Sequence, residues 1–522
     1  MRGKPEFVKN KVGRRVPTWV NGKEQVPFMG PGAYKPVGMK QAPPVRSCRD
    51  YPASGDKRVK DLKTALKKCG LRDGMVISNH HHFRDGDKVA LAALQAAAEL
   101  GVKDLMWFPS ASFPCQEPVI DLMDRGVVHH IEGSMNGPLG RHCSYGKMKG
   151  LGVLRSHGGR WQALQDGDVH VDIAVIAAPT ADSFGNADGS HGPSACGSLF
   201  FALADSMYAD HVIVVTDNLV PFPCVPWHIQ GNNVDYVVEV DTVGDPSKIV
   251  SGTTQITKSP DRLLISEYVA RFLRDAGIMR DGFSFQAGSG GIALAFVEYL
   301  KVMMRESGVK ARFVRGGSTQ FLVDMLNEGL TDYILDGQTF DLAGVRSMAE
   351  NPRHVATSPF TSYNYHGKGN FASIVDAAIL GATEVDVHFN ANVVTHSDGL
   401  LLHGIGGWQN CLDAKCSILA LPAFRDRIPV IVDEVTTITG PGDLIDVVIT
   451  ERGIAINPKR KDLLAAVKNS DLPIRPIREI KDEVEKLLGG APEKPRLDKD
   501  RPVAVVKWVD GTIIDTVWQV EK

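Results

Sequence analysis

Short apolar runs alternate with longer amphipathic segments along most of the chain. Residues 173–178, 212–215 and 430–432 are continuously apolar, which is typical of strands buried on both faces of a parallel sheet. The segments between such runs carry helix boundary signals. Ser259-Pro260 can open a helix and Gly277 can close it. The pattern therefore predicts an α/β fold.

The order of these elements repeats about 208 residues later. A Gly-Leu-Arg-Asp-Gly segment at 70–74 precedes a strand, a polar loop, a helix over 88–100 and a second strand, and Gly-Ile-Met-Arg-Asp-Gly at 277–282 precedes the same series. Residues 234–239 match 445–450, and Asp172 with the strand after it matches Asp386. Three matches in the same order indicate a duplication. We predict two pseudo-repeated open α/β domains.

The domain boundaries follow from this repeat. The first domain spans 53–257. The second spans 258–522 and ends with a helix over 476–488 and a β-hairpin over 503–520, for which Asp510-Gly511 predicts a type I′ turn. Residues 1–52 hold eleven Lys/Arg, three acids and many prolines without a periodic pattern. They predict an extended basic N-terminal arm, which either straps over the protein's own surface or docks on an acidic or phosphate-bearing partner.

Composition excludes several classes of protein. The 522 residues carry a net charge of -2, so nothing favours nucleic-acid binding, and the apolar runs are far too short to cross a membrane. No signal peptide is apparent. The eight cysteines are scattered without a Cys-x-x-Cys pair, which indicates reduced thiols in a cytoplasmic protein and no metal site.

Three loops carry candidate chemistry, because ligands of open α/β sheets bind where parallel strands end. The loop 78–85 concentrates cationic or donor groups (His80, His81, His82 and Arg84). It can bind carboxylates or form a structural histidine cluster, and it lacks the spacing of a metal site. Gly288-Ser289-Gly290-Gly291 and Gly404-Ile-Gly406-Gly407 expose backbone amides that can hold an anion or an oxyanion. Each is otherwise an ordinary turn.

An ordered set of motifs in the second half resembles the coenzyme A transferases and acetyl-CoA hydrolases. The set comprises 404–407, 417–422, 429–432, 435–437 and Asp-Val-Val-Ile-Thr-Glu-Arg-Gly-Ile-Ala at 446–455. Within that superfamily the whole chain resembles the citrate lyase α chains, through 80–87, 179–189 and 362–366.

This resemblance implies a transferase that moves an acyl-carrier thiol from acetate to citrate, giving citryl carrier protein and acetate within a citrate lyase complex. It implies partners: an acyl carrier protein (the γ subunit) and the lyase β subunit, with a homo-oligomer expected. It implies no cofactor bound by the chain itself, because the CoA-like group, triphosphoribosyl-dephospho-CoA, belongs to the carrier. The alternatives are a transferase or hydrolase acting on free CoA thioesters, and a non-catalytic sugar-phosphate-binding module.

One departure from the superfamily pattern concerns the nucleophile. Many relatives place a Glu after the third strand of this domain, whereas the comparable segment here reads Gly316-Gly-Ser-Thr-Gln320. An amide cannot form a glutamyl thioester, so the resemblance implies direct attack by the incoming carboxylate through a mixed anhydride. The predicted catalytic residues are Gln320, Gly406 and Gly407. The predicted substrate-binding residues are His80, His81, Arg84, Gly288, Ser289, Gly290, Gly291 and Gly404.

Overall fold

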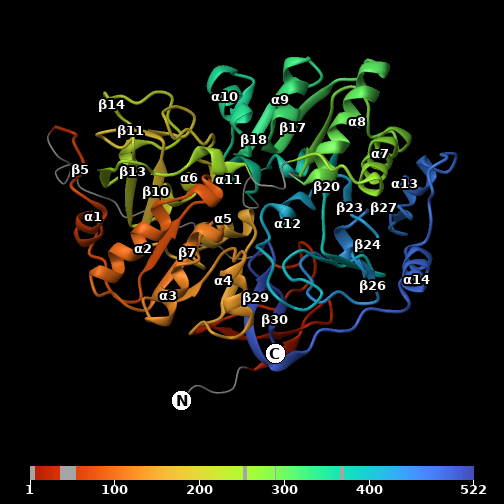
Figure 1. Cartoon of the computed structure of the whole chain (residues 1–522), viewed down its shortest axis with the longest axis horizontal. Helices are drawn as coiled ribbons and strands as arrows, with labels where there is room; N and C mark the ends of the chain where they lie inside the picture. Colours follow the sequence, from red (N-terminus) through yellow and green to blue (C-terminus); the bar gives the residue numbers. More distant parts are fainter. Residues whose placement is uncertain (1–5, 36–53, 251–254, 289, 365–368, 522) are drawn as a thin grey trace.

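Two large and mostly parallel β-sheets lie side by side in the computed structural model, which describes residues 6–35, 54–250, 255–288, 290–364 and 369–521 (Figure 1). The first sheet is parallel throughout. Its strands in spatial order are β5 (Arg58–Val59), β15 (Tyr236–Glu239), β13 (His211–Thr216), β10 (Ile173–Ala178), β6 (Val76–Asn79), β7 (Leu105–Pro109) and β8 (Val128–Ile131).

The second sheet has one antiparallel pair at its edge. Its strands in spatial order are β19 (His354–Ala356), β18 (Ile334–Thr339), β17 (Ala311–Ser318), β16 (Phe283–Ala287), β20 (Ala377–Leu380), β23 (Ser417–Ala420), β27 (Val447–Thr450) and β28 (Gly453–Ile456). The α/β fold class is therefore confirmed.

Helices connect and cover the strands of both sheets (Figure 1). Those of the first half are α1 (Leu62–Lys68), α2 (Val89–Glu99), α3 (Val119–Asp124), α4 (Pro138–Ser144), α5 (His157–Asp166) and α6 (Phe200–Tyr208). Those of the second half are α7 (Pro260–Asp275), α8 (Gly291–Ser307), α9 (Gln320–Asn327), α10 (Leu342–Glu350), α11 (Pro359–Ser362), α12 (Trp408–Cys411), α13 (Lys461–Ala466) and α14 (Ile477–Leu488). The helix predicted to open at Ser259-Pro260 is α7, and its Pro stands at the first turn.

Six strands take the same spatial order in both sheets, and each half adds a small sheet of the same pattern. In the first half β11 (Thr180–Asp182) pairs with β12 (Ala187–Asp188) and β14 (Leu219–Val220). In the second half β21 (Glu384–Asp386) pairs with β22 (Ala391–Asn392) and β26 (Ile431–Val432), with the same parallel and antiparallel directions.

Aspartate hydrogen bonds correct one match of the predicted repeat. Asp172 accepts a bond from Val76 N at the start of β6 (2.7 Å), and Asp376 accepts one from Ser284 N in β16 (2.9 Å). Asp172 therefore corresponds to Asp376. Asp386 instead accepts bonds within its own turn, as Asp182 does in the first half. Matching Asp172 with Asp386 was wrong, because each half has two aspartates ten residues apart, Asp172 and Asp182 in the first and Asp376 and Asp386 in the second.

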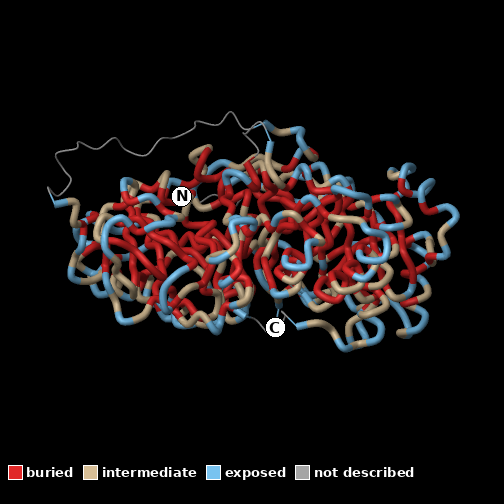
Figure 2. Tube along the Cα trace, turned by 90° about the horizontal axis from the view of Figure 1, so that it is seen from above, coloured by how far each residue is buried: buried red, intermediate tan, exposed pale blue. Residues whose placement is uncertain are grey.

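The two halves share buried apolar side chains. One cluster of buried residues includes Leu66 of α1, Val385 of β21 and Val506 near the C-terminus, whereas a second cluster is confined to the second half, with Phe285 and Leu300 as examples. Buried positions run through both halves in Figure 2. The two halves therefore share one packed interior, which holds them together.

The C-terminal hairpin joins the halves. Its strands are β29 (Leu497–Lys507) and β30 (Ile513–Val520), and β29 pairs with β9 (Gly152–Leu154) of the first half. The predicted type I′ turn is wrong, because Gly511 has a positive φ of 88° but Asp510 does not. Gly511 N donates to Trp508 O (3.0 Å) and Trp508 N to Thr512 O (2.7 Å). This is a type I turn closed by a glycine bulge.

The N-terminal residues 6–28 lie on this hairpin. They form β1 (Phe7–Lys9), β2 (Arg15–Pro17), β3 (Trp19–Val20) and β4 (Lys23–Glu24). Asn10 Nδ2 donates to Ile514 O at 2.7 Å, and Arg14 Nε lies 3.3 Å from Asp515 Oδ2. These residues thus cover the protein's own surface. Positions 1–5 and 36–52 of the predicted arm, and Ser289, lie outside the described residues.

Candidate active site

His80 begins the loop after β6 and is tied to the interior of the first half. Its Nε2 lies 2.9 Å from Asp205 Oδ2, and Arg160 Nη1 lies 2.5 Å from Oδ1 of the same carboxylate. All three side chains are buried, and burial lowers the pKa of His80 despite the opposing charge of Asp205. These contacts make His80 an anchor for the loop, with its Nε2 already engaged.

His81 reaches across to the second half. Its Nδ1 lies 2.6 Å from Ser110 Oγ, and its Nε2 lies 3.2 Å from Oε1 of Gln338 in β18. Its ring stacks on His157, with centroids 5.2 Å apart. Burial, with the nearby His157 and Arg84, keeps the pKa of His81 well below 6.5. The imidazole is therefore neutral near pH 7 and offers hydrogen bonds without a charge.

Arg84 supplies the charge in this loop. Its backbone is left-handed (φ 53°), and its guanidinium lies 5.3 Å from the ring of Phe113 and 4.8 Å from that of Phe340 in the second half. Burial lowers the pKa of Arg84 to about 10, so the group stays cationic. No carboxylate pairs with it among the described residues, where its Nε also has no hydrogen-bond partner. It can therefore bind an anion.

The predicted glycine turn meets this loop through His157. His157 N donates to Gly406 O at 2.8 Å. A Cβ on Gly404 would lie 2.2 Å from Ser134 Cβ, and one on Gly407 would lie 2.7 Å from the Tyr363 hydroxyl. The turn therefore needs glycine because it packs directly on Ser134 of the first half and on Tyr363 of the second. It also lies close to His81, as predicted for loops at strand ends.

The second glycine loop opens α8 and borders a cavity of about 240 Å³. Gly288, Gly290 and Gly291 line it together with Arg262 and Arg425. Trp408, which follows the 404–407 turn, donates from Nε1 to Gly381 O (2.8 Å), and Gly381 also lines the cavity. The residue after the 404–407 turn is therefore one hydrogen bond away from the lining of this cavity. Arginines and a helix N-terminus suit phosphate or carboxylate groups.

The comparisons with known proteins decide the family. Residues 55–520 match the model of the family "Citrate lyase, alpha subunit (CitF)". The chain is 38% identical over 483 residues to the citrate lyase alpha chain of Haemophilus influenzae. The aligned region covers 92% of this chain and 96% of that one. The chain belongs to the citrate lyase α-subunit family.

A solved structure agrees with this assignment. The α subunit of citrate lyase from Streptococcus mutans, described as putative and solved in complex with citrate, is 38% identical with a TM-score of 0.94. The match covers 98% of this chain and all of that one. At 16% identity, 4-hydroxybutyrate CoA-transferase from Porphyromonas gingivalis (TM-score 0.53, covering 83% of this chain and 98% of that one) shares the fold alone. The chain is thus a citrate lyase α subunit, and its fold is shared with a CoA-transferase.

Gln320 of this α subunit lies apart from the cluster around His81. The residue is exposed at the start of α9. Its Nε2 donates to Asp324 Oδ1 one helical turn later (2.7 Å), and its backbone N donates to Asp341 (2.7 Å). These contacts do not link it to the glycine turns. Its predicted role in orienting an acyl oxygen stays a prediction without support from its surroundings.

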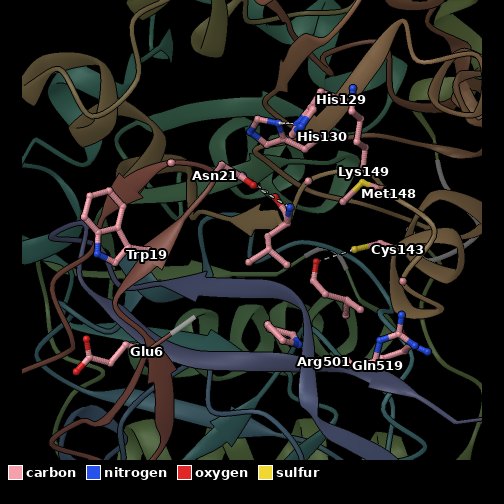
Figure 3. Close-up of a pocket in the computed structure, with 16 residues that line it drawn as sticks. Glu6, Trp19, Asn21, His129, His130, Cys143, Met148, Lys149, Arg501 and Gln519 are labelled. Atoms are coloured by element: carbon pink, nitrogen blue, oxygen red, sulfur yellow. Dashed lines mark hydrogen bonds between the residues drawn. The ribbon is translucent and has the colours of Figure 1, made fainter. Parts of the chain in front are cut away.

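A separate cavity of about 980 Å³ lies between the N-terminal segment and the hairpin (Figure 3). Trp19, His129, Lys149 and Arg501 are among its lining residues, and none of the predicted site residues borders it.

Among the described residues, no helix is long and apolar enough to cross a membrane. Within the described residues, His170, Asp172 and Asp210 lie close enough together to hold a metal ion. This group is outside the predicted histidine loop.

Three residues near the glycine turn of this α subunit were not among the predicted site residues: Arg315, Tyr363 and Gln286. Arg315 lies in β17 with its guanidinium 5.1 Å from the Tyr363 ring, and it pairs in register with Gln286 of β16. Burial raises the pKa of Tyr363 to about 12, against the effect of Arg315. The sequence held one signal for Arg315, which is a charged residue near the carboxyl end of a buried strand. It stands in the run Phe-Val-Arg at 313–315.

Proposed function

We propose that this α subunit transfers an acyl-carrier thiol from acetate to citrate. An acetyl thioester on an acyl carrier protein and citrate would give a citryl thioester and free acetate. One thioester replaces another, so the exchange needs no external energy source. The β subunit of the complex would then cleave the citryl thioester.

One observation carries this proposal. The amide N–H groups of Gly406 and Gly407 have no hydrogen-bond partner within the described residues, and both residues are only half-buried. They lie between His157 of the first half and Tyr363 of the second. Adjacent free amides at such a place suit the oxyanion that forms when a thioester carbonyl is attacked.

The chemistry would proceed in two displacements. A citrate carboxylate oxygen attacks the acetyl carbonyl, and the C–S bond breaks to release the thiolate and leave a mixed citryl–acetyl anhydride. The thiolate then attacks the citryl carbonyl and expels acetate. The amides of Gly406 and Gly407 would stabilise each tetrahedral oxyanion, and Arg84 would hold a carboxylate that does not react. Neutral His81 would donate or accept a hydrogen bond.

The second glycine loop suits the carrier's prosthetic group. Triphosphoribosyl-dephospho-CoA carries several phosphates, and the cavity by Gly288, Gly290 and Gly291 offers Arg262, Arg425 and the N-terminus of the 17-residue helix α8. These donors match phosphate chemistry. The cofactor would therefore remain bound to its carrier and be held here only by its phosphates. Gln320 has no part in this proposal.

The proposal includes an assembly and a location. The partners would be the carrier protein (γ subunit) and the lyase β subunit, with further copies of this chain in a homo-oligomer in the cytoplasm. A transferase or hydrolase acting on free CoA thioesters is the alternative, and the cavity by Gly290 would suit its phosphates equally. The experiment must therefore distinguish an acetyl carrier protein from free acetyl-CoA as the thioester donor.

The two halves would be copies of one ancestral unit, at 53–257 and 258–522, behind a basic arm at 1–52. Support comes from equivalent side-chain bonds. Asp235 accepts from Val212 N and Asp446 from Ser417 N, both at 2.8 Å. The terminal hairpin would be a later addition, because it pairs with β9 of the first half.

The experiment supplies the purified chain with acetyl carrier protein or acetyl-CoA, plus labelled citrate. A citryl thioester and one equivalent of acetate are expected, with the carrier as the better donor. Acetate release without citrate would support the hydrolase instead. No thioester exchange with either donor, in the presence of the β and γ subunits, would refute the proposal.

A further inference from the structure

Arg315 is a buried cation without an opposing charge. Its side chain is 1% exposed. No Asp or Glu pairs with it among the described residues, and within them its Nε and Nη1 have no hydrogen-bond partner. An unpaired charge in a protein interior is strongly unfavourable unless something compensates it. The ring of Tyr363, 5.1 Å from the guanidinium, compensates only in part.

Other buried arginines of this fold are paired. Arg160 binds Asp205 through both terminal nitrogens, and Arg155 Nε lies 3.2 Å from Glu132 Oε2. Both side chains are buried. The fold therefore supplies a carboxylate where an arginine has a purely structural role. Arg315 lacks one, which indicates that its anion comes from outside the chain.

The surroundings of Arg315 lead to the glycine turn of the proposed active site. Gln286 lies beside it on the neighbouring strand, with its Oε1 also unpartnered and its Nε2 2.7 Å from Cys411 Sγ. Cys411 Sγ in turn donates to Gly407 O at 3.1 Å. Tyr363 lies between Arg315 and Gly407. An anion at Arg315 would therefore be one side chain away from the Gly406 and Gly407 amides.

We propose that Arg315 binds a carboxylate of the acid substrate, one that does not take part in acyl transfer. This rests on the proposed function, because it assigns an end of the same site. Hydrogen bonds from a guanidinium to a carboxylate are charge-assisted and strong, and two of the donors of Arg315, Nε and Nη1 on different sides of the group, lack partners. Arg84 of the opposite half also has no carboxylate partner within the described part of the chain. A tricarboxylate has one reacting group and one for each arginine, whereas a dicarboxylate can serve only one of them and acetate has none to spare.

The test is calorimetric binding of citrate to the purified full chain, wild type against Arg315→Met, Arg315→Lys and a control. Arg312 stands on the same strand but is exposed, so Arg312→Met is the matched control. We expect Arg315→Met to weaken citrate binding at least about 100-fold, Arg315→Lys about 10-fold and the control by less than about 2-fold. Citrate binding by Arg315→Met within about 3-fold of wild type would overturn the proposal.

Thermal unfolding separates ligand binding from a structural role. If the anion that Arg315 binds is a ligand, Arg315→Met without citrate unfolds at the wild-type temperature or above. The substitution removes an unpaired buried charge. The variant then also loses the upward shift that citrate gives the wild type. A lowered midpoint without citrate would assign Arg315 a structural role and overturn the proposal. Should Arg315→Met fail to fold, the Lys variant is decisive, and wild-type affinity there overturns it.

Failure of the proposed function would look different. Exchange of labelled acetate into the acetyl carrier needs transfer but no second carboxylate, so the wild type and the control Arg312→Met should both show it. If the wild type binds citrate through Arg315 but exchanges no acetate, the transfer chemistry fails while the carboxylate contact stands.

Discussion

Replacing Gly404 with alanine tests how the glycine turn is held in place. The new Cβ would lie 2.2 Å from Ser134 Cβ, 2.3 Å from its Oγ and 2.7 Å from its Cα. Unbonded carbon atoms prefer about 3.5–4.0 Å, so the turn must retreat by roughly 1 Å. Gly404 does not have a positive φ, so this contact alone causes the strain.

Such a displacement reaches the two amides of the proposed oxyanion site. Gly406 and Gly407 follow within three residues, and a misplacement of about 1 Å can cost roughly 100-fold in rate. We expect Gly404→Ala to lower kcat for citryl thioester formation by about 100-fold. Overpacking should reduce the free energy of unfolding by about 1–3 kcal/mol.

A second substitution makes this prediction specific. Ser134→Gly removes the Cβ and Oγ that the alanine would meet but leaves the contact with the Cα, so the double variant should regain at least about 10-fold in kcat and part of the stability. Gly369→Ala is the control, because nothing lies within 4 Å of its Cβ position. Wild-type kinetics in Gly404→Ala, or a double variant no better than the single one, would refute the reasoning.

Four further outcomes are expected. Burial lowers the pKa of His81 and of His157 (to about 3) below the unfolded value of 6.5. The unfolded chain therefore binds more protons, and stability in urea should fall as pH drops below 6.5, by up to about 1.4 kcal/mol per group per pH unit. A pH-independent urea midpoint would contradict this. Burial raises the pKa of Asp87 to about 6, so this group opposes the trend below pH 6, and Asp87→Asn should raise the urea midpoint at pH 7 but not at pH 3.5. Arg262→Gln should raise KM for the carrier about 10-fold, less so in high salt, and leave KM for citrate unchanged. An unchanged carrier KM would remove phosphate binding from that cavity. Gln320→Glu should give no intermediate that borohydride or hydroxylamine traps, because the side chain is exposed and bonded to its own helix. Trapping in that variant alone would restore Gln320 to the active site.

The sequence determined the elements and their order, because the patterns that encode them are local. An apolar run of four to six residues, a capping serine before a proline and a glycine after the last turn all act within a few positions. The helix α7 and the strand β10 were therefore predictable almost to the residue. The ordered motifs from Gly404 onward were sufficient to indicate the family. The hairpin was predicted but its turn type was not, because Asp510 side-chain bonds to Thr512 favour a right-handed backbone there.

Tertiary structure decided which of these residues work together. His81 loses its charge only because His157, Phe201 and the second half enclose it. Arg315 is one arginine among many in the sequence, and it becomes informative only when burial leaves it without a carboxylate. Gln320 was assigned to the site by its motif, and this stays a prediction because its side chain is exposed and bonded to Asp324 of its own helix. Burial and desolvation depend on contacts between residues that are hundreds of positions apart, and no local pattern encodes them.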